Sequence, residues 1–223
     1  MPTAHRILTA LAGRRYLARD ERTRRFRLGP AALDLGERAR AVLDLRQVAL
    51  PVLRRLARET DETALLTVPS SAGDHSICLE RVESSHPLRL SVEPGRQLPL
   101  HAGASQKALL AFLGPEQIDP IASGPLERLC RATITDGDAL RADLAEVRAQ
   151  GWATSFEETN LGVWGVAVPL LTEEGTAVAA IGIAGPSARL SQDKVLDHLE
   201  RLREAALETG AALGLEVPEL TWP

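Results

Sequence analysis

The side chains that most often carry chemistry are few in this sequence and form no recognisable catalytic or metal-binding motif. The five histidines are scattered from His5 to His198, with no HxxxH pair and no His/Cys cluster at metal-ligand spacing. There is also no G-x-S-x-G nucleophile elbow and no glycine-rich phosphate loop. We therefore expect no metal, no cofactor and no enzymatic activity.

Charge is distributed unevenly along the chain. Residues 1–30 hold eight arginines against Asp20 and Glu21, a net charge of +6, whereas the whole chain carries −4. A basic end on an acidic body is typical of a protein that places one end on a polyanion such as DNA. The charge distribution alone is equally compatible with an arginine-rich terminus that is simply exposed to solvent.

The elements predicted for residues 1–29 place this charge on a helix and a hairpin. Apolar residues at i, i+3, i+4 and i+7 predict a helix over 3–12, and two short runs predict strands at 16–18 and 25–28. Helix followed by basic hairpin is the order of the recognition helix and wing of a winged helix-turn-helix. The candidates for DNA contact are Thr3, His5 and Arg6 on the helix, and Arg22, Arg24 and Arg25 on the wing. Each could instead be an ordinary surface side chain.

The rest of the chain predicts helices packed on a sheet. We expect helices near 31–42, 45–59, 103–113, 136–150 and 191–213. Pro51 should kink or begin the second of these, Thr135 or Asp136 should cap the fourth, and Ser191 the last. Strands are expected near 63–68, 76–82, 88–92, 152–156, 163–170 and 177–184. This order predicts an α+β fold in which helices pack on a mostly antiparallel sheet.

The compartment follows from what the sequence lacks. No apolar run approaches the roughly 20 residues of a membrane span, and the first residues have no apolar signal-peptide core. Cys78 and Cys130 are too few for a disulfide framework. We expect a cytoplasmic protein with no membrane contact and two small buried thiols.

Three stretches, in order, resemble motifs of the IclR family of transcriptional regulators. The most specific covers 151–171, and the others cover 98–113 (LPLHAGASQKALLAFL) and 179–186 (AAIGIAGP). In the first, the residues that match the family pattern are Gly151, Trp152, Ala153, Glu157, Glu158, Gly162, Ala167 and Pro169.

The resemblance implies a domain organisation. A partial winged helix-turn-helix would occupy 1–29, a linker helix 30–43 and a GAF-like effector-binding domain 44–217. The family's winged helix begins about one helix pair before this sequence does. DNA binding is therefore expected if the missing helices are supplied. The implied partners are double-stranded operator DNA, a small organic acid and further copies of the chain in a homodimer or homotetramer.

The resemblance also implies an effector pocket. Backbone N–H groups near Ala104 and Ser105 would face an oxygen of the ligand, and Leu90, Leu98 and Trp164 would supply apolar walls. Further pocket positions would be Ser155, Gly165, Gly182 and Ala184. Because three of these four are Gly or Ala, we predict a larger or less polar effector, such as an aromatic or longer acid.

Several residues near this pocket allow more than one role. Glu158 and His101 could contact the ligand. The simpler interpretation is that Glu158 caps backbone groups and that His101 is a semi-buried histidine with its hydrogen bonds satisfied. Trp152 is expected to pack on the sheet. Two functions remain open: a ligand-responsive DNA-binding regulator, or a stand-alone ligand-binding or oligomerising module.

Overall fold

The computed structural model divides into two compact units, residues 1–47 and 48–223. It describes all residues except 1, 21–22, 24, 190–191, 220 and 222–223. The predictions for Arg22, Arg24 and the Ser191 cap, and for the side chains of Thr3 and His5, lie outside the described part. No described helix is both long enough and apolar enough to cross a membrane.

The first unit contains the predicted helix and hairpin. Helix α1 (Pro2–Gly13) precedes strands β1 (Leu17–Arg19) and β2 (Phe26–Leu28), which pair antiparallel. Gly29 closes the hairpin, donating its N–H to the Tyr16 carbonyl at 2.8 Å. A Cβ on Gly29 would lie 2.2 Å from the Arg15 carbonyl oxygen, so only glycine fits there.

Helix α2 (Pro30–Thr60) corrects one prediction. We expected two helices with a kink or start at Pro51, but one continuous helix runs from the first unit into the second. Proline removes one backbone hydrogen bond and its ring crowds the carbonyl four residues earlier, which together cost about 3 kcal/mol. Burial of Val52, Leu53 and Leu56 beside it stabilises the helix by about 1.5–3 kcal/mol per side chain, which offsets that loss.

The second unit is built on one six-stranded antiparallel sheet, which confirms the predicted α+β class. The strand order is β5-β4-β3-β8-β7-β6. The strands are β3 (Thr63–Pro69), β4 (His75–Val82), β5 (Gln97–Pro99), β6 (Ala153–Phe156), β7 (Val163–Leu171) and β8 (Ala177–Pro186).

The predicted strand at 88–92 is wrong, because residues 83–96 contain no strand and the third strand is β5. Side chains rather than a neighbouring strand take up carbonyl groups of this segment. Thr63 Oγ1 donates to the Leu90 carbonyl at 2.8 Å, and Arg81 Nη1 donates to the Val92 carbonyl at 2.6 Å. Side-chain hydrogen bonds to the backbone, rather than strand pairing, therefore hold this segment.

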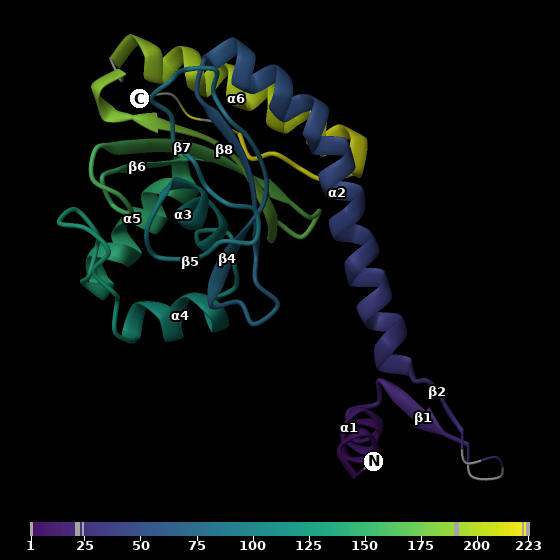
Figure 1. Ribbon diagram of the computed structural model, residues 1–223. Coiled ribbons are helices and arrows are strands. Elements are labelled where there is room, and N and C mark those ends of the chain that lie inside the picture. The colour runs from purple at the N-terminus through teal and green to yellow at the C-terminus, as the bar shows by residue number, and fades with distance from the viewer. Residues whose placement is uncertain (1, 21–22, 24, 190–191, 220, 222–223) are drawn as a thin grey trace. The chain divides into compact units, whose positions relative to one another are not determined.

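Helices cover both faces of the sheet (Figure 1). One face carries α3 (Ala104–Leu110), α4 (Pro115–Ser123) and α5 (Gly137–Gln150), and the other carries α6 (Gln192–Leu213) beside the end of α2. Asp136 caps α5 as predicted, accepting the Ala139 N–H at 2.8 Å, and Gly151 ends it in the left-handed region. The sequence interpretation missed α4, which begins at Pro115 and contains Pro120.

Candidate functional site

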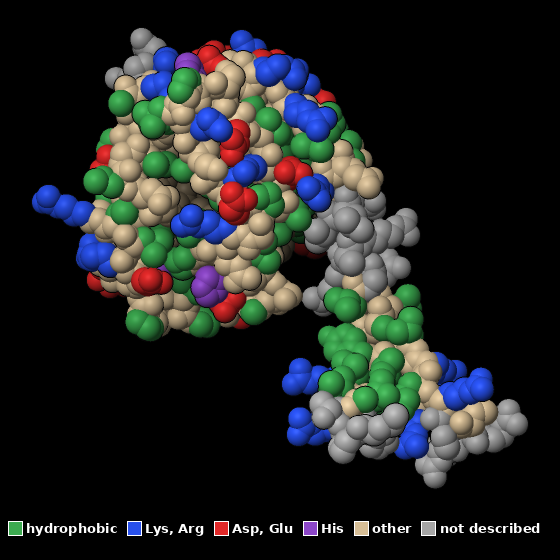
Figure 2. All heavy atoms as spheres, in the orientation of Figure 1, with side chains coloured by type: hydrophobic (Ala, Val, Ile, Leu, Met, Phe, Trp, Pro, Cys, Tyr) green, Lys and Arg blue, Asp and Glu red, His purple; other side chains and the backbone are tan. Residues whose placement is uncertain are grey.

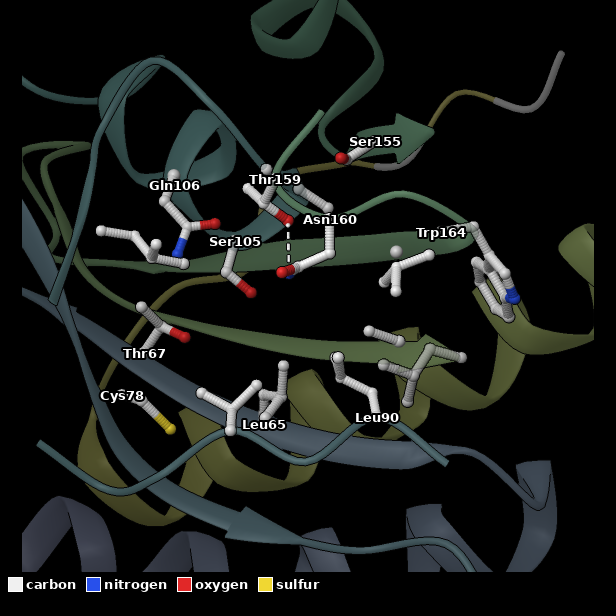
Figure 3. A pocket seen from close by; sticks show the side chains of 18 of the residues that line it. Leu65, Thr67, Cys78, Leu90, Ser105, Gln106, Ser155, Thr159, Asn160 and Trp164 are labelled. Carbon is white, nitrogen blue, oxygen red and sulfur yellow. Dashed lines mark hydrogen bonds between the residues drawn. The ribbon is translucent and has the colours of Figure 1, made fainter. Parts of the chain in front are cut away.

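A cavity lies between the α3 side of the sheet and the segment that precedes β5 (Figure 3). Its volume is about 60 Å³. Residues from α3, from all six strands of the sheet and from the segments that connect them meet around it. They are Leu65, Thr67, Cys78, Leu90, Val92, Arg96, Leu98, Gly103, Ala104, Ser105, Gln106, Ser155, Thr159, Asn160, Val163, Trp164, Gly165, Ile183 and Ala184.

The register of the sheet explains why distant residues meet here. Ser155 pairs with Gly165, and Gly165 with Ala184. Directly paired residues point to the same face of a sheet. A Cβ built on Gly165 would lie 3.5 Å from Ala104 Cβ on α3, so this row of residues faces α3 and the cavity.

Eight of the nine predicted effector-binding residues line this one cavity: Leu90, Leu98, Ala104, Ser105, Ser155, Trp164, Gly165 and Ala184. Their role in ligand binding stays a prediction. Gly182 does not line the cavity. It faces α3, but a Cβ there would lie 2.8 Å from Ser105 Oγ, so the serine covers it. Gly182 allows close packing of α3 on the sheet and adds no open space.

A buried ion pair holds the start of α3. Glu158 is 7% exposed and accepts the Gly103 N–H at 2.9 Å. Its other oxygen lies 2.7 Å from the ammonium of Lys107, which is 2% exposed and also contacts Asp143. This geometry matches the simpler interpretation of Glu158, in which its carboxylate caps a backbone N–H group. The carboxylate points at α3 from the loop that carries the cavity residues Thr159 and Asn160.

That loop, residues 157–162, has a constrained backbone. Glu157 and Gly162 have φ angles of 55° and 72°, in the region that favours glycine. Thr133 Oγ1 donates to the Glu158 carbonyl at 2.6 Å and ties the loop down. Two polar side chains are thereby presented to the cavity, and Asn160 Nδ2 donates to Thr159 Oγ1 at 3.3 Å (Figure 3).

Trp164 borders the cavity, but its ring belongs to the opposite face of the sheet. It stacks on His198 of α6 with ring centroids 5.4 Å apart and planes within 8°. Burial lowers the pKa of His198; Glu62 and Asp197 partly oppose this shift, and Lys194 adds to it. Trp164 therefore connects the rim of the cavity to α6.

The titratable groups near the cavity do not form a catalytic arrangement. Burial raises the pKa of the Cys78 thiol to about 11, so the nucleophilic thiolate is scarce at neutral pH. His101 is buried, and its Nε2 lies 2.9 Å from the Glu127 carbonyl oxygen. In the described part of the chain, no three His, Cys, Asp or Glu side chains gather where they could hold one metal ion.

The charge of the cavity lining is positive. Arg96, an exposed residue, is the one charged residue among those that line the cavity, and no acidic residue is among them. The remaining polar lining consists of hydroxyl and amide side chains, including Thr67, Ser155 and Asn160. Such a lining favours a ligand that is anionic and rich in oxygen.

The first unit exposes both arginines and apolar side chains. Arg6 on α1 and Arg25 beside β2 are exposed. Ile7, Leu28 and Leu33 are 53%, 79% and 68% exposed. Figure 2 shows hydrophobic side chains gathered over this unit with basic side chains around them. The predicted apolar face of α1 is thus present, but Ile7 on that face is not buried.

Comparison with known proteins identifies the family. Residues 38–210 match the family model described as bacterial transcriptional regulator IclR C-terminal. The HTH-type transcriptional regulator BhcR of Paracoccus denitrificans is 35% identical over 92% of this chain and 74% of its own. The chain belongs to the IclR family.

Solved structures of IclR proteins share this fold. An IclR-type transcriptional regulator from Silicibacter sp. TM1040 superimposes with a TM-score of 0.79 at 29% identity, covering 97% of this chain and 85% of that one. An IclR homologue from Microbacterium hydrocarbonoxydans, crystallised with 4-hydroxybenzoate, gives a TM-score of 0.71 at 31% identity, covering 96% and 85%. The relatives are transcriptional regulators, not enzymes.

The IclR resemblance missed about half of the cavity lining. The unpredicted residues include Thr67 and Cys78 on β3 and β4, Arg96 before β5, and Thr159 and Asn160. A signal was available for one of them, because Thr67 is a polar residue on the face that Thr63 and Leu65 share in β3. No pattern in the sequence indicated Arg96, since its position depends on the irregular segment that we predicted as a strand.

Proposed function

We propose that this chain is a ligand-responsive transcription regulator of the IclR family that senses a small organic acid. The observation that carries the proposal is the cavity of the second unit, which lies in the family's C-terminal domain and whose lining has a cation and no carboxylate. An organic acid is the class of small molecule that this lining attracts. The 4-hydroxybenzoate held by the Microbacterium homologue is an acid of this class.

The DNA-contacting part of the proposal rests on the first unit. Helix α1 and the β1–β2 hairpin supply the order of a recognition helix and wing, with Arg6 and Arg25 exposed on them. Thr3, His5, Arg22 and Arg24 complete the proposed contacts from sequence alone. Arginine contacts to phosphate make binding salt-dependent, and contacts to base edges make it sequence-dependent.

The test is fluorescence anisotropy with DNA from the region upstream of the gene, using this chain and a version extended at its N-terminus. We expect salt-sensitive, sequence-dependent binding by the extended version. Arg6→Ala should cost about 1–3 kcal/mol of binding free energy and relax sequence preference, and Arg25→Ala should lower the salt slope by about one. Arg203→Ala, at an exposed position of α6, is the control and should change neither quantity.

The response to ligand is tested in the same assay with 4-hydroxybenzoate and a panel of other organic acids. The proposal expects at least one acid to change the DNA affinity of the extended version. If the extended version binds no DNA specifically, yet an acid binds the protein, the chain is instead a ligand-binding module without DNA activity. The exposed apolar residues of the first unit fit a domain that needs a partner surface, which favours the regulator.

A further inference from the structure

We propose that the cavity has a second polar subsite, formed by Thr67, Cys78, Arg96, Leu98 and Gln106, which takes a second anionic group of the effector. The effector would then be an elongated dicarboxylic acid. This inference rests on the proposed function, because it assumes that the cavity binds an organic acid. We call these five residues the Thr67 subsite.

Three hydroxyl groups on the wall of the cavity have no protein partner within the described part of the chain. Thr67, Ser105 and Ser155 are only 3%, 6% and 8% exposed, and no residue in the described part of the chain hydrogen-bonds to their side chains. Figure 3 shows the Thr67 and Ser105 hydroxyls pointing into the cavity. Their oxygens are not among the enclosed polar atoms without a partner, so they are accessible from the cavity. The polar atoms of a ligand can replace water on these hydroxyls.

The unpartnered hydroxyls lie at opposite ends of the cavity. Thr67 on β3 pairs with Cys78 on β4, whose N–H donates to the Arg96 carbonyl at 3.0 Å, so these residues occupy one side of the sheet. Ser155 is on β6, the opposite edge strand. Three strand spacings separate β3 from β6, roughly 14 Å along the sheet. A single carboxylate cannot reach both ends.

Arg96 gives the Thr67 subsite its preference for an anion. It is the one charged residue of the cavity lining, and within the described part of the chain its side chain makes no ion pair or hydrogen bond. The acidic residue just before it, Glu93, contacts Arg81 Nη1 at 3.4 Å instead. Arg96 is exposed, so its guanidinium is available to a carboxylate at the edge of the cavity, for which it provides paired donors.

The test is isothermal titration calorimetry of the full chain with matched acids: adipate and suberate against hexanoate and octanoate. The dicarboxylates should bind at least about tenfold more tightly than monocarboxylates of equal length. Arg96→Gln should weaken dicarboxylate binding about tenfold and Thr67→Val, which keeps the side-chain shape, about three- to tenfold. Both variants should weaken monocarboxylate binding by a smaller factor than dicarboxylate binding, so that the preference for dicarboxylates decreases. Thr154→Val and Arg203→Gln, at exposed positions away from the cavity, are the matched controls.

Each contrary outcome has a distinct meaning. If monocarboxylates bind as tightly as dicarboxylates, or if both variants weaken the two classes equally, the Thr67 subsite is overturned and the proposed function stands. If no acid binds the wild-type chain, the effector class of the proposed function fails and the subsite fails with it.

Discussion

The indole of Trp164 and the imidazole of His198 stack in parallel planes between the sheet and α6. The centroids are 5.4 Å apart, and both residues are at least 96% buried because Trp164 is 3% and His198 4% exposed. Neither Trp164 Nε1 nor His198 Nδ1 has a hydrogen-bond partner among the residues that the structure describes. The imidazole is thus a buried ring whose neutral form is favoured, at the point where the cavity rim meets α6.

This stack predicts a loss of stability in mild acid. Because burial lowers the pKa of His198 below its usual 6.5, the unfolded chain takes up a proton at a higher pH than the folded chain does. The free energy of unfolding should therefore decrease as the pH falls below about 6.5. His198→Phe keeps a stacked ring without a titratable group and should flatten this dependence in urea unfolding between about pH 7 and pH 5. If the free energy of unfolding of His198→Phe depended on pH as steeply as that of the wild type, His198 would not be the group responsible.

The ion pair between Lys107 and Glu158 predicts a large effect on folding. Lys107→Met leaves a buried carboxylate without its cation and should cost about 3–5 kcal/mol in urea unfolding. The double variant Lys107→Met/Glu158→Gln removes both charges and should recover more than half of that loss. Arg201→Met breaks an exposed pair with Glu204 and should cost less than about 1 kcal/mol. If Lys107→Met and Arg201→Met lowered the free energy of unfolding equally, the buried pair would not contribute more to stability than an exposed one.

The two glycines that face α3 should differ in their tolerance of a methyl group. A Cβ on Gly182 would lie 2.8 Å from Ser105 Oγ and 3.2 Å from Ala167 Cβ, so Gly182→Ala should destabilise the fold by about 1–3 kcal/mol. The nearest contact at Gly165 is 3.5 Å, and Gly165→Ala should change stability by less than about 1 kcal/mol. Thermal unfolding measures both, and the reverse order would be inconsistent with the packing described for α3.

The two cysteines should react at different rates with a thiol reagent. Cys78 is buried and its pKa is raised to about 11, whereas Cys130 is half-buried. At about pH 8 the Cys130→Ser variant, which retains Cys78, should react only as fast as the protein unfolds, and Cys78→Ser should react promptly. Between pH 9 and 11 the unfolded Cys78 thiol loses its proton first, so this residue lowers stability as the pH rises through that window. If Cys130→Ser and Cys78→Ser reacted with the thiol reagent at similar rates, Cys78 would not be protected by burial.

The sequence was a good guide where local signals decide the structure. The Asp136 cap and the Gly151 end of α5 follow from side-chain chemistry within a few residues. The antiparallel sheet was predicted from the order of helices and strands, and the eight cavity residues from the resemblance to the family. Residues at paired positions in neighbouring strands, such as Ser155 and Gly165, then had to meet.

The failures arose where distant contacts override local patterns. Packing within the second unit keeps α2 helical through Pro51. Side chains from β3 and β4 hold the 83–96 segment without strand pairing. A register shift in the β3–β4 pair lies between Leu66 and Thr67, so the pairing of Thr67 with Cys78 could not be counted along the chain. The pocket consequently proved more polar than the Gly and Ala positions had suggested.

The most direct test asks whether an acid occupies the cavity. Ser155 and Thr154 are neighbours on β6, but Ser155 is buried at the cavity and Thr154 is exposed on the other face. Ser155→Leu should fill the cavity, and Thr154→Leu is its matched control. The measurement is the shift of Tm on adding saturating 4-hydroxybenzoate or adipate. Wild type and Thr154→Leu should gain roughly 5–10 °C at about 100 times Kd, and Ser155→Leu should gain nothing. An equal gain in Ser155→Leu would contradict the account.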